Sequence, residues 1–290
     1  MDMRIVIGVD FGEPSLTAVR WTARHFGSRA ELVLAHALFM PEPPSFLRGL
    51  YPPASELIED AQRGAESRLQ ELRTSVDAPS VSLEVRVGRP DEVLLQVAED
   101  RQAELIVIGP HDERPGVWKL LGSTAERVVR GGPRAVLLAR GLKVEGPSRV
   151  LLAIDESEVR HEVLVWGARL AREFGTDVIA VHVANPLQHG AAMVAGSPQE
   201  RERAEGQMRE RATSWMRAEL ADAGLPDAIP HVAFGDAGFE ILSAVSRHRA
   251  ELVVVGRHGA GGTAGAFMGS VPEFLLRNGT GSVLTVGGRG

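Results

Sequence analysis

The chain has one stretch that decides its fold, Glu251-Leu252-Val253-Val254-Val255-Gly256-Arg257-His258-Gly259, followed nine residues later by Gly269-Ser270. The apolar run from Leu252 to Val255 is typical of a buried parallel strand. The segment Gly256 to Gly259 is then the turn at the carboxyl end of that strand, where open α/β sheets bind ligands. Glycine in such a turn lets backbone N–H groups approach phosphate oxygens, so the stretch points to nucleotide binding.

A helix start is predicted directly after this loop. Ser270 and Glu273 have the S-x-x-E spacing of a capping box, and an apolar run begins at Phe274. The amino terminus of a helix attracts anions through its N–H groups and its dipole. The alternative interpretation is structural: Ser270 would only cap the helix, and the glycines would only turn the chain.

The same frame occurs 147 residues earlier, as Gly109-Pro110-His111-Asp112, nine residues, and Gly122-Ser123. Other landmarks recur at nearly the same offset: Asp10 with Asp155, Trp21 with Trp166, His36 with His182, and Gly88 with Gly235. A repeat of this length is a whole domain rather than a solenoid unit. We therefore expect two tandem domains, residues 1–141 and 148–290, joined by a short linker.

Strands and helices alternate along each repeat. In the first repeat the predicted strands are 4–9, 32–38, 81–87, 105–108 and 135–139, and the predicted helices are 15–26, 55–76, 91–100 and 123–130. The second repeat begins with strand 149–154, and a capping box with proline at the first helical position starts a helix at Ser197 that extends to about Asp222. Right-handed crossovers in this alternation give an α/β fold: two tandem, doubly wound, five-stranded parallel-sheet domains.

As a set, these residues resemble the universal stress protein family in its tandem form, whose ATP-binding members carry G-2x-G-9x-G-(S/T) after the fourth strand. The second repeat matches every specified position of that motif. The resemblance implies an adenine-nucleotide alpha-hydrolase-like fold and ATP as ligand, with or without Mg²⁺. It implies a nucleotide site made of Asp155, Val183, Gly256, Arg257, His258, Gly259, Gly269, Ser270 and Val271.

Some of these roles have alternatives in the residues themselves. A carboxylate at the end of a strand, such as Asp155, can accept hydrogen bonds from ribose hydroxyls, but it can equally cap a turn or a helix. His258 and its counterpart His111 could donate to phosphate or face solvent.

The first repeat departs from the motif at Asp112, which replaces the second glycine and puts a carboxylate where phosphate would approach. Pro110 also removes an N–H donor, and together these changes should cost about 1 to 3 kcal/mol. A Mg²⁺ ion between Asp112 and the phosphates is the alternative. We expect a degenerate, weaker site in this domain, formed by Asp10, Ala37, Gly109, Gly122, Ser123 and Thr124.

The sequence does not contain a complete motif for dinucleotide binding, a P-loop, zinc binding or a serine hydrolase. Residues 259–264 fit G-x-G-x-x-A, but the acidic residue of a dinucleotide site is missing about 20 positions on, and no P-loop lysine motif is found. His161-Glu162 begins like H-E-x-x-H, but position 165 is Val, so no zinc site is expected. The sequence also lacks a G-x-S-x-G elbow, so we expect no catalytic residues and no efficient catalysis.

Composition narrows the partners. The chain has no cysteine, which excludes disulfides. Its formal charge of -6 disfavours nucleic acid and anionic membranes as partners. No apolar run reaches the roughly 20 residues that span a bilayer, and the amino terminus has no signal-peptide pattern, so we expect a cytoplasmic protein. The final strands, 134–140 and 282–286, are predicted sheet edges. The resemblance to the universal stress protein family implies pairing at these edges, and we expect an intramolecular pseudo-dimer, with a further homodimer as the alternative.

Three functional hypotheses follow. The first is a cytoplasmic ATP-binding regulatory protein of the stress response, with the nucleotide held mainly in the second domain. The second is a slow ATPase that uses the same pocket. The third is a scaffold that binds no nucleotide and acts through its dimer surfaces.

Overall fold

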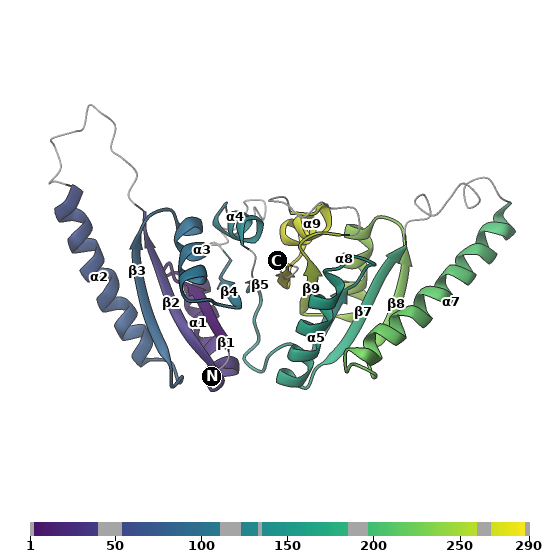
Figure 1. The fold of residues 1–290 in the computed structure, drawn as a ribbon, viewed down its shortest axis with the longest axis horizontal. Coiled ribbons are helices and arrows are strands. Elements are labelled where there is room, and N and C mark those ends of the chain that lie inside the picture. The colour runs from purple at the N-terminus through teal and green to yellow at the C-terminus, as the bar shows by residue number, and fades with distance from the viewer. Residues whose placement is uncertain are drawn as a thin grey trace, which may run out of the picture. The chain divides into compact units, whose positions relative to one another are not determined.

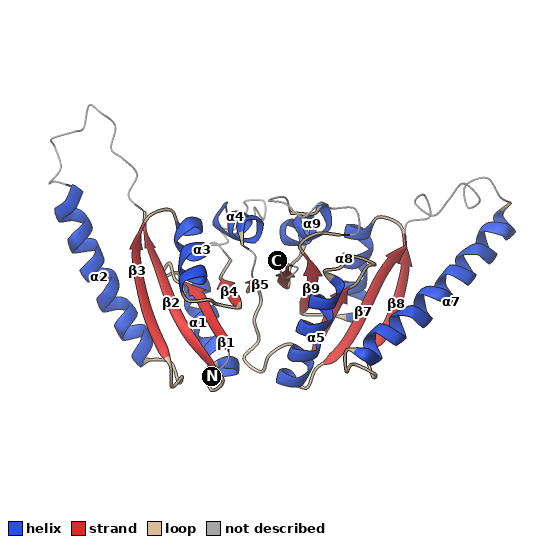
Figure 2. Cartoon of the chain, viewed as in Figure 1, coloured by secondary structure: helices blue, strands red, loops and turns tan. Residues whose placement is uncertain are grey.

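In a computed structural model the chain divides into two compact units, Met1–Leu142 (unit 1) and Lys143–Gly290 (unit 2), drawn in Figure 1. The structure describes residues 3–39, 54–110, 123–132, 135–184, 197–259 and 268–287. In both units parallel strands alternate with helices, as the colouring of Figure 2 shows. The predicted fold class is confirmed.

Within unit 1 the strands lie in the order β3-β2-β1-β4-β5, and every described pairing between them is parallel. The elements are β1 (Met3–Gly8), α1 (Glu13–Phe26), β2 (Ala30–Leu38), α2 (Ala54–Thr74), β3 (Val81–Val87), α3 (Pro90–Asp100), β4 (Leu105–Ile108), α4 (Ser123–Gly131) and β5 (Ala135–Leu138).

Unit 2 repeats this arrangement with its strands in the order β8-β7-β6-β9-β10, again parallel. Its elements are β6 (Arg149–Ala153), α5 (Arg160–Phe174), β7 (Asp177–Ala184), α7 (Pro198–Asp222), β8 (Ile229–Phe234), α8 (Ala237–His248), β9 (Leu252–Gly256), α9 (Ser270–Asn278) and β10 (Ser282–Val286).

The central strands form the core of each unit and are apolar on both faces. Ile5 and Ile106 in unit 1, like Leu151 and Val254 in unit 2, are fully buried. Helices cover both faces of each sheet: α3 packs against α4, and α8 against α9, while right-handed crossovers put the other helices on the opposite face. Burying each such aliphatic side chain stabilises the fold by roughly 1.5 to 3 kcal/mol.

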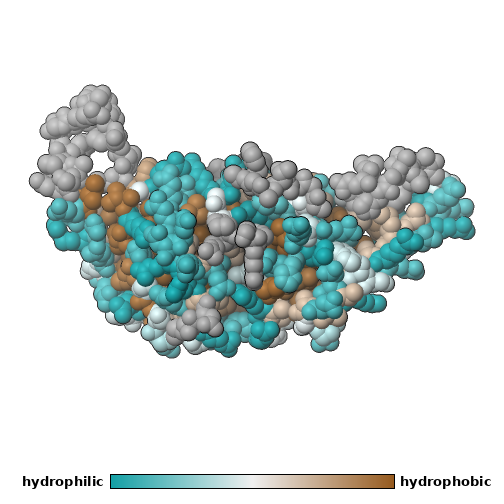
Figure 3. Space-filling model, viewed as in Figure 1, coloured by the Kyte–Doolittle hydropathy of each residue, from teal (hydrophilic) through white to brown (hydrophobic). Residues whose placement is uncertain are grey.

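Helix α7 begins where the sequence predicts. The Ser197 hydroxyl accepts a hydrogen bond from the Glu200 N–H (3.4 Å), and the Glu200 carboxylate accepts one from the Ser197 N–H (2.7 Å). This reciprocal pair confirms the capping box at Ser197. Hydrophilic side chains predominate along the exposed face of α7, as Figure 3 shows. None of the described helices is long and apolar enough to cross a membrane.

The strand order determines where a ligand can bind. In each unit the chain reverses its direction of winding at the central pair, β1 with β4 and β6 with β9. The connections that leave these two neighbouring strands pass to opposite faces of the sheet, so a crevice opens at their carboxyl ends. Both cavities described below lie at this point.

Candidate functional site

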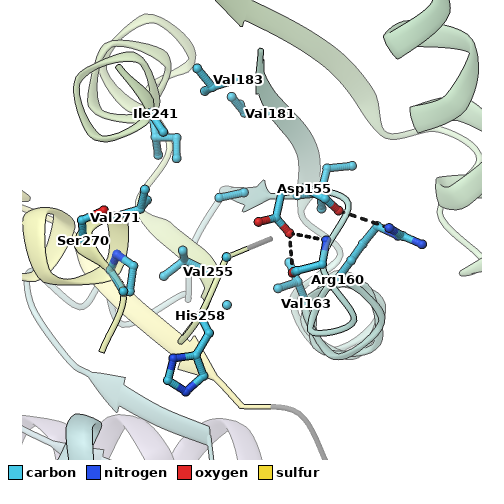
Figure 4. A pocket seen from close by; sticks show the side chains of 18 residues that line it. Asp155, Arg160, Val163, Val181, Val183, Ile241, Val255, His258, Ser270 and Val271 are labelled. Carbon is cyan, nitrogen blue, oxygen red and sulfur yellow. Dashed lines mark hydrogen bonds between the residues drawn. The ribbon is translucent and has the colours of Figure 1, made fainter. Parts of the chain in front are cut away.

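A cavity of about 360 Å³ opens at the carboxyl ends of β6 and β9 in unit 2, and Figure 4 shows it from close by. Its walls come from the ends of β6, β7 and β9, from the starts of α5 and α9, and from α8. Eight of the nine residues that the sequence assigned to a nucleotide site line this cavity: Asp155, Val183, Gly256, His258, Gly259, Gly269, Ser270 and Val271.

The ninth residue, Arg257, does not line the cavity. Its N–H donates to the Val286 carbonyl (2.7 Å), and its own carbonyl accepts from the Gly269 N–H (2.8 Å). Its side chain is 7% exposed, and burial lowers the pKa of the guanidinium. The backbone of Arg257 therefore connects the end of β9 to β10 and to the start of α9. Its place in the glycine motif does not reveal this role.

This contact also changes the interpretation of Pro110, which occupies the position of Arg257 in unit 1. The N–H that proline lacks is the one that in unit 2 pairs with the Val286 carbonyl of β10. The expectation that Pro110 removes a phosphate donor is therefore wrong, because the equivalent donor in unit 2 is already used inside the sheet.

Three glycines bring the backbone and side chains of the loop close together. A Cβ atom on Gly256 would lie 3.0 Å from Val159 Cγ1, and one on Gly259 would lie 3.1 Å from Asp155 Oδ2. A Cβ atom on Gly269 would lie 3.2 Å from the Arg257 carbonyl oxygen. None of the three has a positive φ, so glycine serves here for space rather than for a left-handed conformation.

Helix α9 begins one residue earlier than the predicted capping box requires. Gly269 is the N-cap, with φ -64° and ψ 158°, and its carbonyl accepts from the Glu273 N–H at 3.2 Å. Ser270 is thus the first helical residue, and the capping box at Ser270 and Glu273 is wrong. Because Pro272 has no N–H, the first-turn donors that this helix can direct at an anion are those of Ser270 and Val271.

At the other end of the cavity, β7 continues past the end of β6. The Val181 carbonyl accepts from the Ile154 N–H (2.9 Å) toward β6, and the Ala184 carbonyl accepts from the Gly235 N–H (3.3 Å) toward β8. Backbone groups on a strand alternate between its two neighbours, so the N–H and carbonyl of Val183 face the β6 side. Since β6 has already ended there, this backbone edge can pair with a heterocyclic base.

The cavity has both polar and apolar lining residues. Asp155 lies between the two ends, and its Oδ1 accepts hydrogen bonds from the Ser157 N–H (3.0 Å) and from the Ser157 hydroxyl. Apolar side chains line the cavity as well: Val163, Val181, Val183, Ile241, Val255 and Val271. Such a cavity can hold a flat ring, hydrogen-bond a hydroxylated group and offer N–H donors to an anion.

His258 is one of the titratable residues that line the cavity, and it belongs to the glycine loop. Burial lowers its pKa, and the charge of neighbouring Arg257 lowers it further. The imidazole is therefore neutral near pH 7 and becomes a stronger donor only when it gains a proton. Among the described residues no group of three or more His, Asp or Glu side chains has the arrangement of a metal site.

Unit 1 has a smaller cavity of about 250 Å³ at the equivalent edge of its sheet. Asp10, Ala37, Gly109 and Thr124, which the sequence assigned to a weaker site, line it. Gly122, His111 and Asp112, together with the side chain of Ser123, lie outside the described part of the chain. The fold thus brings together those residues of the weaker site that can be placed.

Each of the two repeats matches the same family of known proteins. The sequence profile described as the universal stress protein family matches residues 1–140 and again residues 147–287. The chain belongs to the universal stress protein family. The universal stress protein Rv2623 of Mycobacterium tuberculosis is 28% identical to it over 287 residues, which cover 94% of this chain and 92% of the relative. A universal stress protein of Mycolicibacterium smegmatis is 25% identical over 295 residues, covering 97% and 96%.

A solved structure supports the fold of this universal stress protein over its whole length. The crystal structure of a universal stress protein from Archaeoglobus fulgidus superimposes with a TM-score of 0.70 and covers 98% of both chains at 18% identity. The resemblance inferred from the glycine motif and the repeat is thereby confirmed at the level of family and fold.

Sequence reasoning missed one charged residue of the universal stress protein's cavity, Arg160. It lines the wall beside Asp155, where its Nη1 donates to the Asp155 carbonyl at 3.3 Å. A signal was present: Arg160 is the first residue of α5, and a cation is unfavourable near the amino terminus of a helix. An arginine at such a position indicates a specific partner, which in this structure is Glu219.

Proposed function

We propose that this universal stress protein binds an adenine nucleotide, with ATP as the preferred form, in the cavity of unit 2 and acts as a nucleotide-dependent regulatory protein of the stress response. One observation carries the proposal. A single cavity contains an open backbone edge at Val183, a carboxylate at Asp155 and the amino terminus of α9 beside the glycine loop. These are the three chemistries that a base, a ribose and phosphates require.

Each part of the nucleotide has its own place in the proposal. The base would pair with the Val183 backbone and pack on the apolar wall, while the ribose hydroxyls would donate to the Asp155 carboxylate. The phosphates would accept hydrogen bonds from the loop that contains Gly259 and from the N–H groups of Ser270 and Val271. A Mg²⁺ ion would arrive with the nucleotide, since it prefers phosphate oxygens and water as ligands.

Unit 1 is proposed as the weaker of the two sites. It keeps the strand-end carboxylate, Asp10, and a backbone edge at Ala37. In the sequence, however, Asp112 stands where the glycine motif has its second glycine. A carboxylate there repels phosphate, so unit 1 should bind ATP less tightly than unit 2.

Thermal unfolding with and without Mg-ATP tests the proposal. A ligand present at 100 times its dissociation constant adds about 2.7 kcal/mol to the stability of the domain that binds it, so the protein stripped of nucleotide should gain several degrees in Tm. Adenosine and tripolyphosphate, used separately, show whether both halves of the ligand are needed. No shift with Mg-ATP would contradict the proposal and favour a scaffold.

The same samples separate binding from catalysis. A regulatory site should hold ATP without sustained turnover, and a slow ATPase should release ADP steadily. ADP release that disappears in a Gly259→Asp variant would move the proposal from a binding protein to an ATPase that uses this cavity. The proposal also implies a cytoplasmic location, because that is where ATP is available.

A further inference from the structure

Four side chains connect the outer helix α7 to the nucleotide cavity of unit 2, and we call this group the α7 latch: Arg160, His182, Trp215 and Glu219. Glu219 on α7 joins two of the others with its two oxygens. Its Oε2 accepts from Arg160 Nε at 3.0 Å, and its Oε1 accepts from Trp215 Nε1 at 3.2 Å. The ring of Trp215 lies between the Arg160 guanidinium (5.4 Å) and the His182 imidazole (5.2 Å).

The latch holds the backbone on both sides of Asp155. His182 Nδ1 donates to the Ile154 carbonyl at 3.0 Å, and Arg160 Nη1 donates to the Asp155 carbonyl at 3.3 Å. Figure 4 shows Arg160 beyond Asp155 as seen from Ser270, with its hydrogen bond to the Asp155 backbone drawn. With the carbonyls before and after its Cα atom both fixed, the direction of the Asp155 side chain is restricted.

The ion pair between Arg160 and Glu219 is partly shielded from solvent and is held in place by other contacts. The Arg160 side chain is 25% exposed and the Glu219 side chain 28% exposed. The pair is also oriented by the Trp215 N–H and by stacking of the guanidinium over the indole ring. A pair held by several contacts loses less to side-chain freedom than a single surface pair.

Unit 1 has no such latch, although its fold is the same. Arg160 is replaced by Ser15, Trp215 by Arg68 and Glu219 by Leu72 at the equivalent positions. The histidine alone is kept, and His36 Nδ1 donates to the Val9 carbonyl at 2.7 Å. Since the sheet and helices of unit 1 form without the latch, the fold does not require these residues, which argues for a role at the ligand site.

We propose that the α7 latch positions the Asp155 carboxylate for the ribose hydroxyls and so makes unit 2 selective for ribonucleotides over nucleotides that lack these hydroxyls. Glu219 is the central positioning residue, because it orients both Arg160 and Trp215 without lining the cavity itself. The inference rests on the proposed nucleotide site of unit 2. It adds which form of the sugar that site accepts and which helix sets the preference.

The inference is tested by combining substitutions in the protein with removal of the ribose hydroxyls from the nucleotide. The dissociation constants of ATP and of 2′,3′-dideoxy-ATP are measured for the wild-type protein, for Glu219→Gln and for Glu210→Gln. Glu210 is an exposed residue on the same helix, so its replacement makes the same charge change away from the latch. In the wild-type protein ATP should bind about tenfold more tightly than the dideoxy compound, because hydrogen bonds to a carboxylate are lost with the hydroxyls.

Glu219→Gln should weaken ATP binding several-fold and leave binding of the dideoxy compound unchanged, so the preference for ribose shrinks toward unity. Glu210→Gln should behave like the wild-type protein. Trp215→Phe keeps an aromatic ring between Arg160 and His182 but removes the N–H donor, and it should cause an intermediate loss. The Tm of each variant without ligand shows whether it is folded.

Two results would overturn the inference. If Glu219→Gln weakens ATP and dideoxy-ATP equally, the latch only supports the structure, and if it weakens neither, the latch has no part in binding. In both cases a wild-type protein that binds ATP leaves the proposed function intact. If the wild-type protein binds neither nucleotide, the proposed function fails and this inference fails with it.

Discussion

The two units place the same kind of cavity at the same edge of the same sheet, but they surround it with different side chains. In unit 2 the strand-end carboxylate, Asp155, is half-buried and its backbone is held by Arg160. In unit 1 the equivalent Asp10 is exposed, and Ser15 replaces the arginine, its hydroxyl donating to the Gly12 carbonyl at 2.9 Å. The shared fold therefore provides the cavity, whereas a few side chains around it differ and should decide how tightly a ligand binds.

The residue after the aspartate shows the same divergence. In unit 1 it is Phe11, a non-glycine residue with φ 63°, whose ring contacts His36 (4.7 Å between centroids) and lies 3.8 Å from the Arg68 guanidinium carbon. In unit 2 it is Glu156, which is exposed. A left-handed conformation is unfavourable for phenylalanine and persists only where packing compensates for it. The contacts of the Phe11 ring with His36 and Arg68 compensate for this strained backbone conformation in unit 1.

The largest effect is expected from giving unit 2 the aspartate that unit 1 has in its loop. Gly259→Asp should weaken ATP binding by about 10- to 100-fold or more, because a carboxylate there repels the phosphates. It would also crowd Asp155, whose Oδ2 lies 3.1 Å from where a Cβ atom on Gly259 would be. Fluorescence titration with a labelled ATP analogue measures the change.

The matched control is Gly206→Asp, which adds the same charge on the exposed surface of α7, where a Cβ atom would meet nothing within 4 Å. This variant should bind ATP like the wild-type protein. Equal affinity in Gly259→Asp and Gly206→Asp would contradict the proposed difference between the two units, since the loop of unit 2 would then not face the phosphates.

A smaller effect, of about tenfold, is expected from the two strand-end aspartates when each is replaced in turn. Asp155→Ala should weaken ATP binding because it removes the proposed acceptor of the ribose hydroxyls. Asp10→Ala should leave the high-affinity site unchanged because it alters only unit 1. Isothermal titration calorimetry gives both affinities, and an opposite ranking of the two variants would assign the better site to unit 1.

A few-fold effect is expected from pH through His258. Its pKa is lowered by burial and by Arg257, so the imidazole is neutral in the free protein near pH 7. A bound phosphate would raise that pKa, so binding takes up a proton and ATP affinity should increase as the pH falls from about 8 to about 6. His258→Gln should lose this part of the pH dependence.

The ligand's own titration is present in both proteins, so the difference between the wild-type and His258→Gln slopes isolates the imidazole. Parallel slopes would mean that His258 does not contact the phosphates. That result would remove His258 from the proposed site without affecting Gly259 or Ser270.

The smallest effect concerns stability. It arises where each unit has a different pair of titratable side chains between its outermost strand and the end of the following helix. In unit 1 Arg101 Nη2 donates to Glu84 Oε1 at 2.6 Å, whereas unit 2 has His231 and His248 there, with Nδ1 and Nε2 3.1 Å apart. Burial favours a higher pKa for Glu84, but the hydrogen bonds from Arg101 and Arg86 outweigh it and lower the pKa. Burial lowers the pKa of both histidines, with further contributions from neighbouring positive charges.

These directions predict that acid weakens the two units in different pH ranges. The lowered pKa keeps the folded histidine pair neutral to a lower pH than free histidine. The contribution of the pair to unit 2 is therefore complete above the ordinary pKa of 6.5 and decreases below it, where the unfolded chain takes up protons first. The Glu84 contribution is present above the ordinary pKa of 4.5 and is lost only as the pH falls through its lower folded value. Unit 2 should therefore weaken first.

Hydrogen exchange in β8 and β3, followed from about pH 8 to pH 5, measures the two stabilities separately. Protection of β8 should decrease over this range while protection of β3 is retained. His248→Gln should reduce the difference, and replacement of the exposed His161 should not. Simultaneous loss of protection in both strands would show that the pairs do not set the acid stability.

The sequence predicted most of the fold because its signals are local. Short apolar runs such as Leu105 to Ile108 are readily predicted as buried strands. Because the sequence repeats, each strand and helix of one unit is also predicted from its counterpart in the other. The cavity was also predictable from the glycine motif, since parallel strands bring their carboxyl ends to one edge of the sheet. Helix α7 begins at the predicted capping box for the same local reason.

What the sequence could not give depends on contacts between distant residues. Ser270 looks like an N-cap, but the carbonyl of Gly269 accepts the first helical hydrogen bond. Arg257 is in the motif, yet its backbone is used by β10 and its side chain is buried. Arg160 meets Glu219 from 59 residues away, and no spacing rule connects two residues so far apart.

Hydrogen–deuterium exchange of the full chain, with and without Mg-ATP, shows which unit holds the nucleotide and so tests the proposal that ATP binds in the cavity of unit 2. Exchange should slow in the segments that contain the lining residues of the unit 2 cavity, at 155–160, 256–259 and 268–275, with little change at 10–16 and 105–110 in unit 1. Protection confined to the unit 1 segments, or no protection in either unit at saturating Mg-ATP, would contradict it.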